Sequence, residues 1–197
     1  MKTKNYLIIL SSMIILSCSS NKEEGKVEES NGHAHHDHGA TSEAANSKSP
    51  RTAAMANIGS NHVHVVYSAP SVRGRQVFGG LVAYDEVWVT GAHSATSISF
   101  NEDLIIEGES VPAGKYALFT IPKENGWTVI LNSNYEQHLA DDYDQTEDVL
   151  RVEVENIPSA DQVEQLKFEV ISKDTQTGEL KFSWAERSFV INLKAQN

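Results

Sequence analysis

Short apolar runs separated by turn residues dominate the chain from residue 49 onward. The runs are rich in β-branched and aromatic residues, which favour strands, and sequences typical of hairpin turns lie between several of them. This pattern predicts a short helix at 161–167 and strands at 62–68, 87–90, 96–100, 104–109, 115–121, 127–131, 149–154, 166–171, 179–184 and 188–193. Strands joined by short turns pair antiparallel, so we expect an all-β fold, an antiparallel β-sandwich of the jelly-roll or immunoglobulin-like kind.

The strand expected at 62–68 has two chemically different faces. Val63, Val65 and Tyr67 alternate with His62 and His64 along it. Because successive side chains of a strand point to opposite sides of a sheet, the apolar set is expected in the core. The two imidazoles then leave the sheet on the same outer face.

The strand expected at 115–121 is apolar on both faces. Tyr116 and Leu118 alternate with Ala117 and Phe119, so neither face is suited to solvent. This composition is typical of a strand that is covered on two sides. We therefore expect this strand to serve packing more than chemistry.

The amino terminus carries the features of an export signal. Lys2 and Lys4 precede an apolar run at 6–16 that is too short to span a bilayer and is soon followed by Cys18. The segment resembles a bacterial lipoprotein signal, which implies that residues 1–17 are removed and that Cys18 receives the lipid. The alternative, an ordinary secretory signal, would leave the only cysteine of the chain as a free thiol.

Residues 18–48 are expected to form a flexible tether that leads to a single domain at 49–197. The tether has no aromatic residue, and Val27 is its only larger aliphatic residue, so it offers too little apolar surface to offset the cost of ordering. The stretch 22–24 resembles the export tag of surface lipoproteins. We expect an outer-membrane lipoprotein whose domain lies at the cell surface or at the periplasmic face.

The charge of the chain limits its partners. It carries 16 basic and 27 acidic residues, a formal net charge of −11 at pH 7. This balance argues against nucleic acid and favours cations. The expected partners are therefore the membrane, through the lipid, and a metal ion, with an envelope protein or a glycan as the alternative.

All eight histidines follow residue 32, and their distribution predicts metal binding. Those in the domain, the primary candidate ligands, are His62, His64, His93 and His138. Three or four neutral imidazoles suit Cu(II) or Zn(II), and loops that carry His93 and His138 are expected to close over the strand face. Asp141 and Asp142 are further candidates, either as ligands or as acceptors for imidazole N–H groups. Accessory ligands in the tether, which would bind the same ions more weakly, are His33, His35, His36 and His38.

Several stretches of the domain carry a resemblance to a known family. They are residues 67–75, 78–84, 87–92, 112–122 and 127–132. Together with shorter matches they are similar to a family of bacterial cell-envelope lipoproteins, the domain of unknown function DUF2911. The resemblance implies an all-β fold in the cell envelope. It implies no activity and no catalytic residues.

Histidine stands at positions where the DUF2911 pattern ordinarily has other residues. His93 follows Thr-Gly-Ala, where the pattern has asparagine, and His138 replaces a tryptophan. His62 and His64 also stand at positions where the DUF2911 pattern ordinarily has residues other than histidine. The resemblance therefore implies a histidine-bearing branch of the family.

A second candidate site is cationic. Arg73 and Arg75, separated by one glycine, have the fork geometry that suits a phosphate or a carboxylate. Ion pairs with Asp85, Glu86 or Asp144 are the preferred interpretation of these two arginines.

The predicted function is binding rather than catalysis. The sequence contains no motif of a familiar hydrolase, metalloprotease or nucleotide-binding loop. We expect a lipoprotein that binds copper or zinc through its histidines for storage, delivery or resistance. The alternatives are a glycan- or protein-binding module without metal and, third, a metal-dependent enzyme. The acidic stretch 141–148 has the charge of a calcium loop but lacks its glycine.

Overall fold

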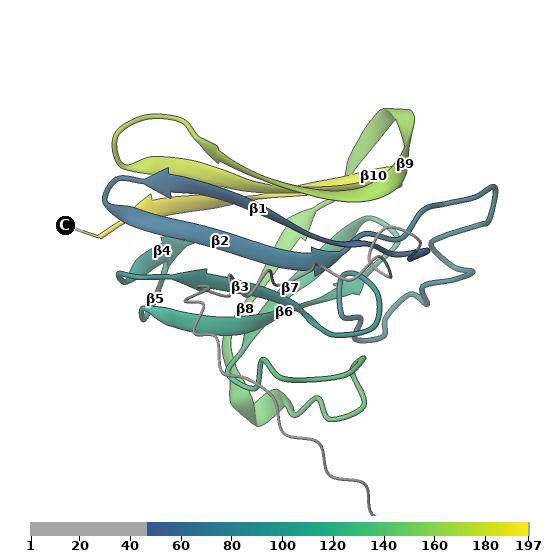
Figure 1. Cartoon of the computed structure of the whole chain (residues 1–197), viewed down its shortest axis with the longest axis horizontal. Helices are drawn as coiled ribbons and strands as arrows, with labels where there is room; N and C mark the ends of the chain where they lie inside the picture. The colour runs from purple at the N-terminus through teal and green to yellow at the C-terminus, as the bar shows by residue number, and fades with distance from the viewer. Residues whose placement is uncertain (1–46, 197) are drawn as a thin grey trace, which may run out of the picture. The chain divides into compact units, whose positions relative to one another are not determined.

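The computed structural model describes residues 47–196, which contain ten strands and one turn of 3₁₀ helix, η2 (Gln145–Glu147) (Figure 1). The predicted signal peptide, Cys18 and the tether up to residue 46 lie outside the described residues, and so do the tether histidines His33, His35, His36 and His38. Within the described part of the chain, no helix has the length and apolar character that spanning a membrane requires.

The strands form two antiparallel sheets. The larger sheet has the order β1 (Arg51–Ile58), β2 (Asn61–Ser68), β3 (Thr96–Phe100), β6 (Gly114–Pro122), β7 (Gly126–Asn132) and β8 (Asp148–Glu155). The smaller sheet has the order β5 (Glu109–Val111), β4 (Leu104–Ile106), β10 (Thr177–Ala195) and β9 (Ile157–Ser172). Buried side chains from both sheets form one main core between them, which confirms the predicted antiparallel sandwich.

Aromatic rings dominate the main core. Trp127 of β7 lies 5.4 Å from Phe182 of β10, and Phe182 stacks on Phe189 at 4.9 Å between ring centroids. Phe78, from the long loop between β2 and β3, lies 5.2 Å from Trp127 and 6.0 Å from Trp184. Aromatic contacts at these distances stabilise a core beyond the burial of their area. The cluster joins both sheets and the loop.

A second, smaller apolar cluster covers the outer face of the larger sheet. Ala117 and Phe119 of β6 and Ile130 of β7 are buried in it. The loop between β7 and β8 lies over them, and its Tyr143 ring meets Phe119 edge-on at 5.3 Å. This arrangement confirms that β6 is covered on two sides.

Two elements depart from the sequence pattern because pairing outweighs local propensity. β1 is not predicted, since its sequence is polar and alanine-rich and only Ile58 is fully buried, but it pairs with β2 along its whole length. The helix predicted at 161–167 is wrong. These residues belong to β9, where Lys167 lies opposite Ser183 of β10.

β10 is one long strand where the pattern predicts two, at 179–184 and 188–193. The interval between them contains an irregularity, with register shifts on both sides of Ala185, whose φ is 52°. Extra residues in one strand of a pair are the signature of a β-bulge, which bends the strand without ending it. Here the extra residues lie in β9, between Pro158 and Lys167, so β10 continues through the predicted gap opposite bulges in its partner strand.

Two other predicted strands are shorter in the structure. Residues 87–90 form only an isolated bridge, between Trp88 and Thr120. Residues 104–109 are divided between β4 and β5, because the chain turns at Glu107, whose φ is 50°.

Arg187 lies on β10 at this register shift and is buried, with 4% of its surface exposed. Its Nε donates to the side-chain oxygen of Asn156 at 2.9 Å, and its Nη2 donates to the carbonyls of Lys123 and Gly126 in the β6–β7 turn. The guanidinium lies 4.7 Å from the centroid of the Trp127 ring. A single cation therefore links the smaller sheet to a turn of the larger one.

We expect Arg187→Lys to lower the free energy of unfolding by about 2–3 kcal/mol, because lysine cannot reproduce the fork of hydrogen bonds. Urea denaturation measures the change. The control is Arg51→Lys, at an exposed position in β1, which is expected to be neutral. Equal losses in the two variants would contradict the role of Arg187.

Candidate functional site

His62 and His64 lie side by side on β2, as the alternation predicts. Their ring centroids are 6.1 Å apart, and Val63 and Val65 are fully buried on the opposite face. Nδ1 of His62 is 2.8 Å from the side-chain oxygen of Asn57 on the adjacent strand β1, which holds the ring. The pair presents two nitrogen ligands on one face of the sheet.

His93 and His138 lie in the two long loops, and backbone contacts hold these loops together. The N–H of Leu139 donates to the carbonyl of His93 at 2.8 Å, and Ser94 and His138 form an antiparallel bridge. The two histidine side chains line different cavities. Between residues 47 and 196, no three His, Cys, Asp or Glu side chains are grouped so that they could hold one metal ion. The structure thus pairs His62 with His64 and does not gather all four histidines.

The acidic residues of the stretch 141–148 have different roles in the structure. Asp141 and Asp142 are exposed in the loop. Asp144 accepts hydrogen bonds from the backbone N–H and the hydroxyl of Thr146, both at 2.8 Å, and these bonds hold the pKa of its carboxyl below the usual value. Asp144 therefore caps η2.

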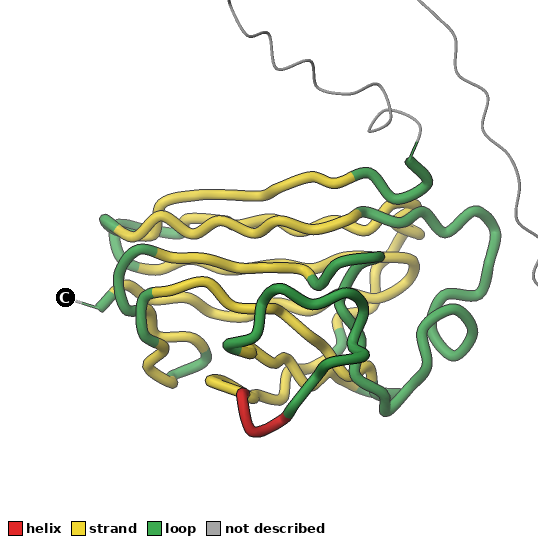
Figure 2. Tube along the Cα trace, turned by 60° about the horizontal axis from the view of Figure 1, so that its bottom comes forward, coloured by secondary structure: helices red, strands yellow, loops and turns green. Residues whose placement is uncertain are grey.

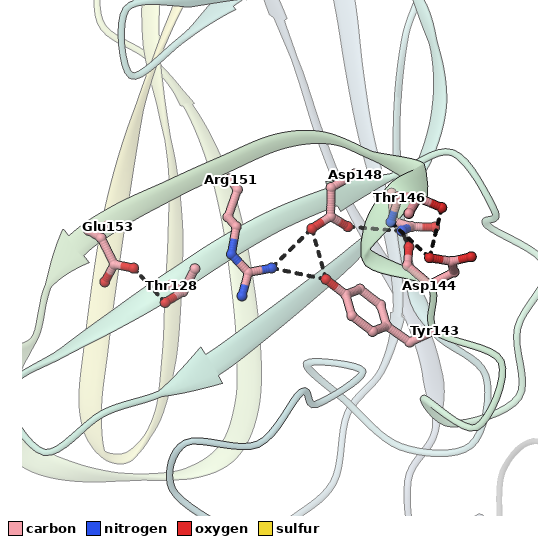
Figure 3. A network of polar contacts seen from close by, with 8 residues as sticks. Thr128, Tyr143, Asp144, Thr146, Asp148, Arg151 and Glu153 are labelled. Carbon is pink, nitrogen blue, oxygen red and sulfur yellow. Dashed lines mark hydrogen bonds and ion pairs between the residues drawn. The ribbon is translucent and has the colours of Figure 1, made fainter.

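A polar network attaches the β7–β8 loop to β8 (Figure 3). The Tyr143 hydroxyl donates to Asp148 at 2.8 Å, and Nη1 of Arg151 donates to the same carboxylate oxygen at 3.0 Å and to the Tyr143 hydroxyl oxygen at 2.9 Å. The amide of Asn132 donates to the other oxygen of Asp148 at 2.9 Å. These bonds fix the loop that carries Leu139.

A cavity of about 590 Å³ lies where the two long loops meet the main core. Both loops are green in Figure 2, and the second leads into the red η2 turn. Trp88 and Trp184 line the cavity and stack on each other, with centroids 5.7 Å apart and planes inclined by 20°. Leu81 and Leu139, one from each loop, also line it and are 50% and 43% exposed. Apolar cavities of this size, within about 300–1,000 Å³, are typical of sites for small organic ligands.

Three cations, Lys48, Arg73 and Arg75, line the same cavity. None of them forms an ion pair with a residue that the structure describes, so the ion pairs predicted for the two arginines are wrong. Arg75 instead donates to the backbone carbonyls of Val72 and Ser71, at 3.0 and 2.7 Å. These bonds orient its guanidinium without neutralising it.

The indole N–H of Trp184 is buried and has no hydrogen-bond partner among residues 47–196. The side chain is 1% exposed and lines the cavity. The other two tryptophans that the structure describes are satisfied, because Trp88 donates to the carbonyl of Gly91 and Trp127 donates to the side chain of Asn156, both at 3.2 Å. Buried indole N–H groups usually have an acceptor, so Trp184 is the exception that needs an explanation.

Backbone strain is concentrated around the cavity. Arg73, His93 and Leu139 all line it and have left-handed backbones, with φ of 51°, 65° and 55°. Residues other than glycine rarely adopt this conformation, and it persists where the surroundings fix it. The loops therefore hold these three side chains in defined positions.

Residues 49–193 match the model of a family described as a protein of unknown function, DUF2911. The chain belongs to the DUF2911 family. Comparisons with curated proteins and with solved structures gave no match. In this DUF2911 domain the matched segment contains β1 to β9 and most of β10, together with Arg73, Arg75 and both stacked tryptophans of the cavity.

Sequence reasoning did not find the cavity of this DUF2911 domain. Trp88 and Trp184 are far apart in the chain, and only the packing of a loop on β10 brings their rings together. One signal was present. The sequence offers Arg73 and Arg75 as a candidate anion site, but the acids of the chain make ion pairs the preferred interpretation. Their lack of ion-pair partners among the described residues decides against it.

Burial raises the pKa of the Tyr143 phenol above 10.0, and so does the hydrogen bond to Asp148. The folded chain therefore keeps this proton to a higher pH than the unfolded chain does. The corresponding stability is fully present below the unfolded pKa and is lost as the pH rises through the folded pKa.

We expect Tyr143→Phe to lower the free energy of unfolding by about 1 kcal/mol at pH 7, because a hydrogen bond to a carboxylate is lost. Above pH 10 the difference from the parent chain should shrink, since the variant lacks the phenol whose pKa is raised. Denaturation at a series of pH values measures both effects. The control is Tyr135→Phe, because the Tyr135 hydroxyl makes no hydrogen bond with the described residues. The prediction would be contradicted if the difference in free energy of unfolding between Tyr143→Phe and the parent chain stayed constant from pH 7 to 11.

Proposed function

We propose that this protein is an outer-membrane lipoprotein that binds a small organic molecule in the cavity beside Trp88 and Trp184. The observation that carries the proposal is the buried indole N–H of Trp184, which has no partner among the described residues and belongs to a side chain that lines an apolar cavity. A buried donor without an acceptor costs free energy, and a bound ligand is the partner that would relieve this cost. Binding of an organic molecule replaces metal binding as the leading function.

The lining of the cavity favours binding over chemical conversion. It is mainly apolar, with two stacked indoles, two exposed leucines and three cations. Sites of this composition hold a ligand by its apolar surface and orient it by a few polar groups. A role in capture or delivery within the cell envelope follows. The predicted signal peptide at 1–17, followed directly by Cys18, supports the membrane anchor, at either the cell surface or the periplasmic face.

The neutral dye N-phenyl-1-naphthylamine tests the cavity itself. We expect one molecule to bind to each chain with a rise in fluorescence, and Ala92→Phe, which adds a ring to the cavity lining, to weaken binding at least about tenfold. The matched control is Ala113→Phe, at an exposed position outside the cavity. Absence of dye binding, or equal binding by both variants, would rule out the cavity as the site.

Metal binding is the second candidate function, and the placement of His62 and His64 on one face of β2 supports it. Two imidazoles that share an ion through bonds of about 2.0 Å have centroids no more than roughly 6.4 Å apart, and these two are 6.1 Å apart. A Cu(II) or Zn(II) ion on this pair would need its remaining ligands from other groups. The proposed use is storage, delivery or resistance. Catalysis by such an ion ranks below binding.

A Cu(II) titration separates the His62–His64 pair from the other histidines. In a chain whose four tether histidines are replaced by alanine, we expect one ion to bind and His64→Ala to weaken binding at least about tenfold, because half of the imidazole ligands are removed. His138→Ala serves as the control and should bind as the parent chain does. If His138→Ala and His93→Ala are each as weak as His64→Ala, all four histidines form one site and the two-histidine site is wrong.

A further inference from the structure

We propose that the ligand of the cavity is a single-chain amphiphile with one anionic head group, such as a carboxylate, whose apolar part lies against Trp88 and Trp184. This inference rests on the proposed function and adds the chemistry of the ligand. It is carried by two independent features of the cavity lining, its apolar walls and its cations, which have no ion-pair partner among the described residues.

The cations point to an anion. Acidic residues outnumber basic ones in this chain by 27 to 16, yet Lys48, Arg73 and Arg75 line one cavity and form no ion pair with any described residue. Glu164 is the carboxylate in hydrogen-bond contact with this segment, and it accepts from the backbone N–H of Arg73 at 3.0 Å rather than forming an ion pair with the guanidinium. Both arginines are exposed, and guanidinium groups with free N–H donors bind carboxylates through paired hydrogen bonds.

The geometry of Arg75 makes it the better defined of the two arginines. Its Nε and Nη2 donate to the carbonyls of Val72 and Ser71, so the plane of the guanidinium is fixed from one side. The guanidinium has five N–H donors, and two of them account for these bonds. The remaining donors are available to a carboxylate, and little side-chain entropy would be lost on binding.

The rest of the lining points to an apolar body. Trp88, Trp184, Leu81 and Leu139 contribute to the walls, and the two leucines are among the large apolar side chains that remain exposed in the described structure. Exposed leucines from two different loops at one cavity indicate a surface that a ligand covers.

Displacement of N-phenyl-1-naphthylamine from the full chain tests the inference, with decanoate, decan-1-ol and acetate as competitors. The first two share an apolar chain and differ in charge, and acetate has the charge alone. We expect decanoate to displace the dye at a concentration at least about tenfold lower than decan-1-ol does, and acetate not to displace it. In the double variant Arg73→Gln/Arg75→Gln, the concentration of decanoate needed to displace the dye should rise to that of decan-1-ol. The concentration of decan-1-ol needed should not change.

The control Arg51→Gln/Lys115→Gln removes the same charge from the second cavity, which both residues line. If this control weakens displacement of the dye by decanoate as much as the arginine variant does, the effect comes from net charge alone. The inference is then overturned. Equal displacement by decanoate and decan-1-ol overturns the inference and leaves the proposed cavity function standing. Failure of the dye to bind removes the proposed function and the inference together.

Discussion

Burial of the Arg187 guanidinium among aromatic rings is the interaction on which the joining of the two sheets depends. An ionised group inside a protein is costly unless its donors are satisfied, and no described carboxylate pairs with this one. Carbonyls of the β6–β7 turn, the side chain of Asn156 and the faces of Trp127 and Phe78 offset the cost. These groups come from the larger sheet and its β6–β7 turn, from the connection between β8 and β9 and from the long loop, whereas Arg187 belongs to the smaller sheet. No one of these groups could satisfy the guanidinium alone. The need to surround this cation therefore fixes how the groups lie relative to one another.

The cavity is a continuation of the same aromatic packing. Phe78 lies over Arg187 and also meets Trp88 and Trp184 edge-on, at 6.2 and 6.0 Å. Trp88 belongs to the loop and Trp184 to β10, so the placement of Phe78 fixes the position of one wall of the cavity relative to the other. The aromatic packing of the core thus continues into the wall of the proposed site, and charged groups line the same cavity at Lys48, Arg73 and Arg75. The same aromatic rings therefore stabilise the core and form part of the proposed site.

The sequence predicted the features that depend on local alternation and missed those that depend on distant contacts. Val63 and His64 were placed on the correct faces of β2, because side chains alternate along any strand. β1 was missed because its alanines form a strand only through pairing with β2. The sequence analysis expects the four histidines of the domain in one site. That residues are of the same type, however, says nothing about how close they lie in the folded chain. The cavity joins a loop to β10, and no spacing rule describes such a contact.

The small apolar cluster on the outer face of the larger sheet forms a layer separate from the main core. Its cover is the β7–β8 loop, which is fastened by the Tyr143–Asp148–Arg151 network and carries Leu139 at the cavity. Segments held by few buried contacts open in cooperative units at a free energy below that of global unfolding. Detachment of this loop would expose the outer face of the sheet and widen the cavity while the two sheets stay joined. The loop that borders the cavity and the core that joins the sheets therefore belong to different apolar layers, so loss of the loop's contacts leaves those of the main core in place.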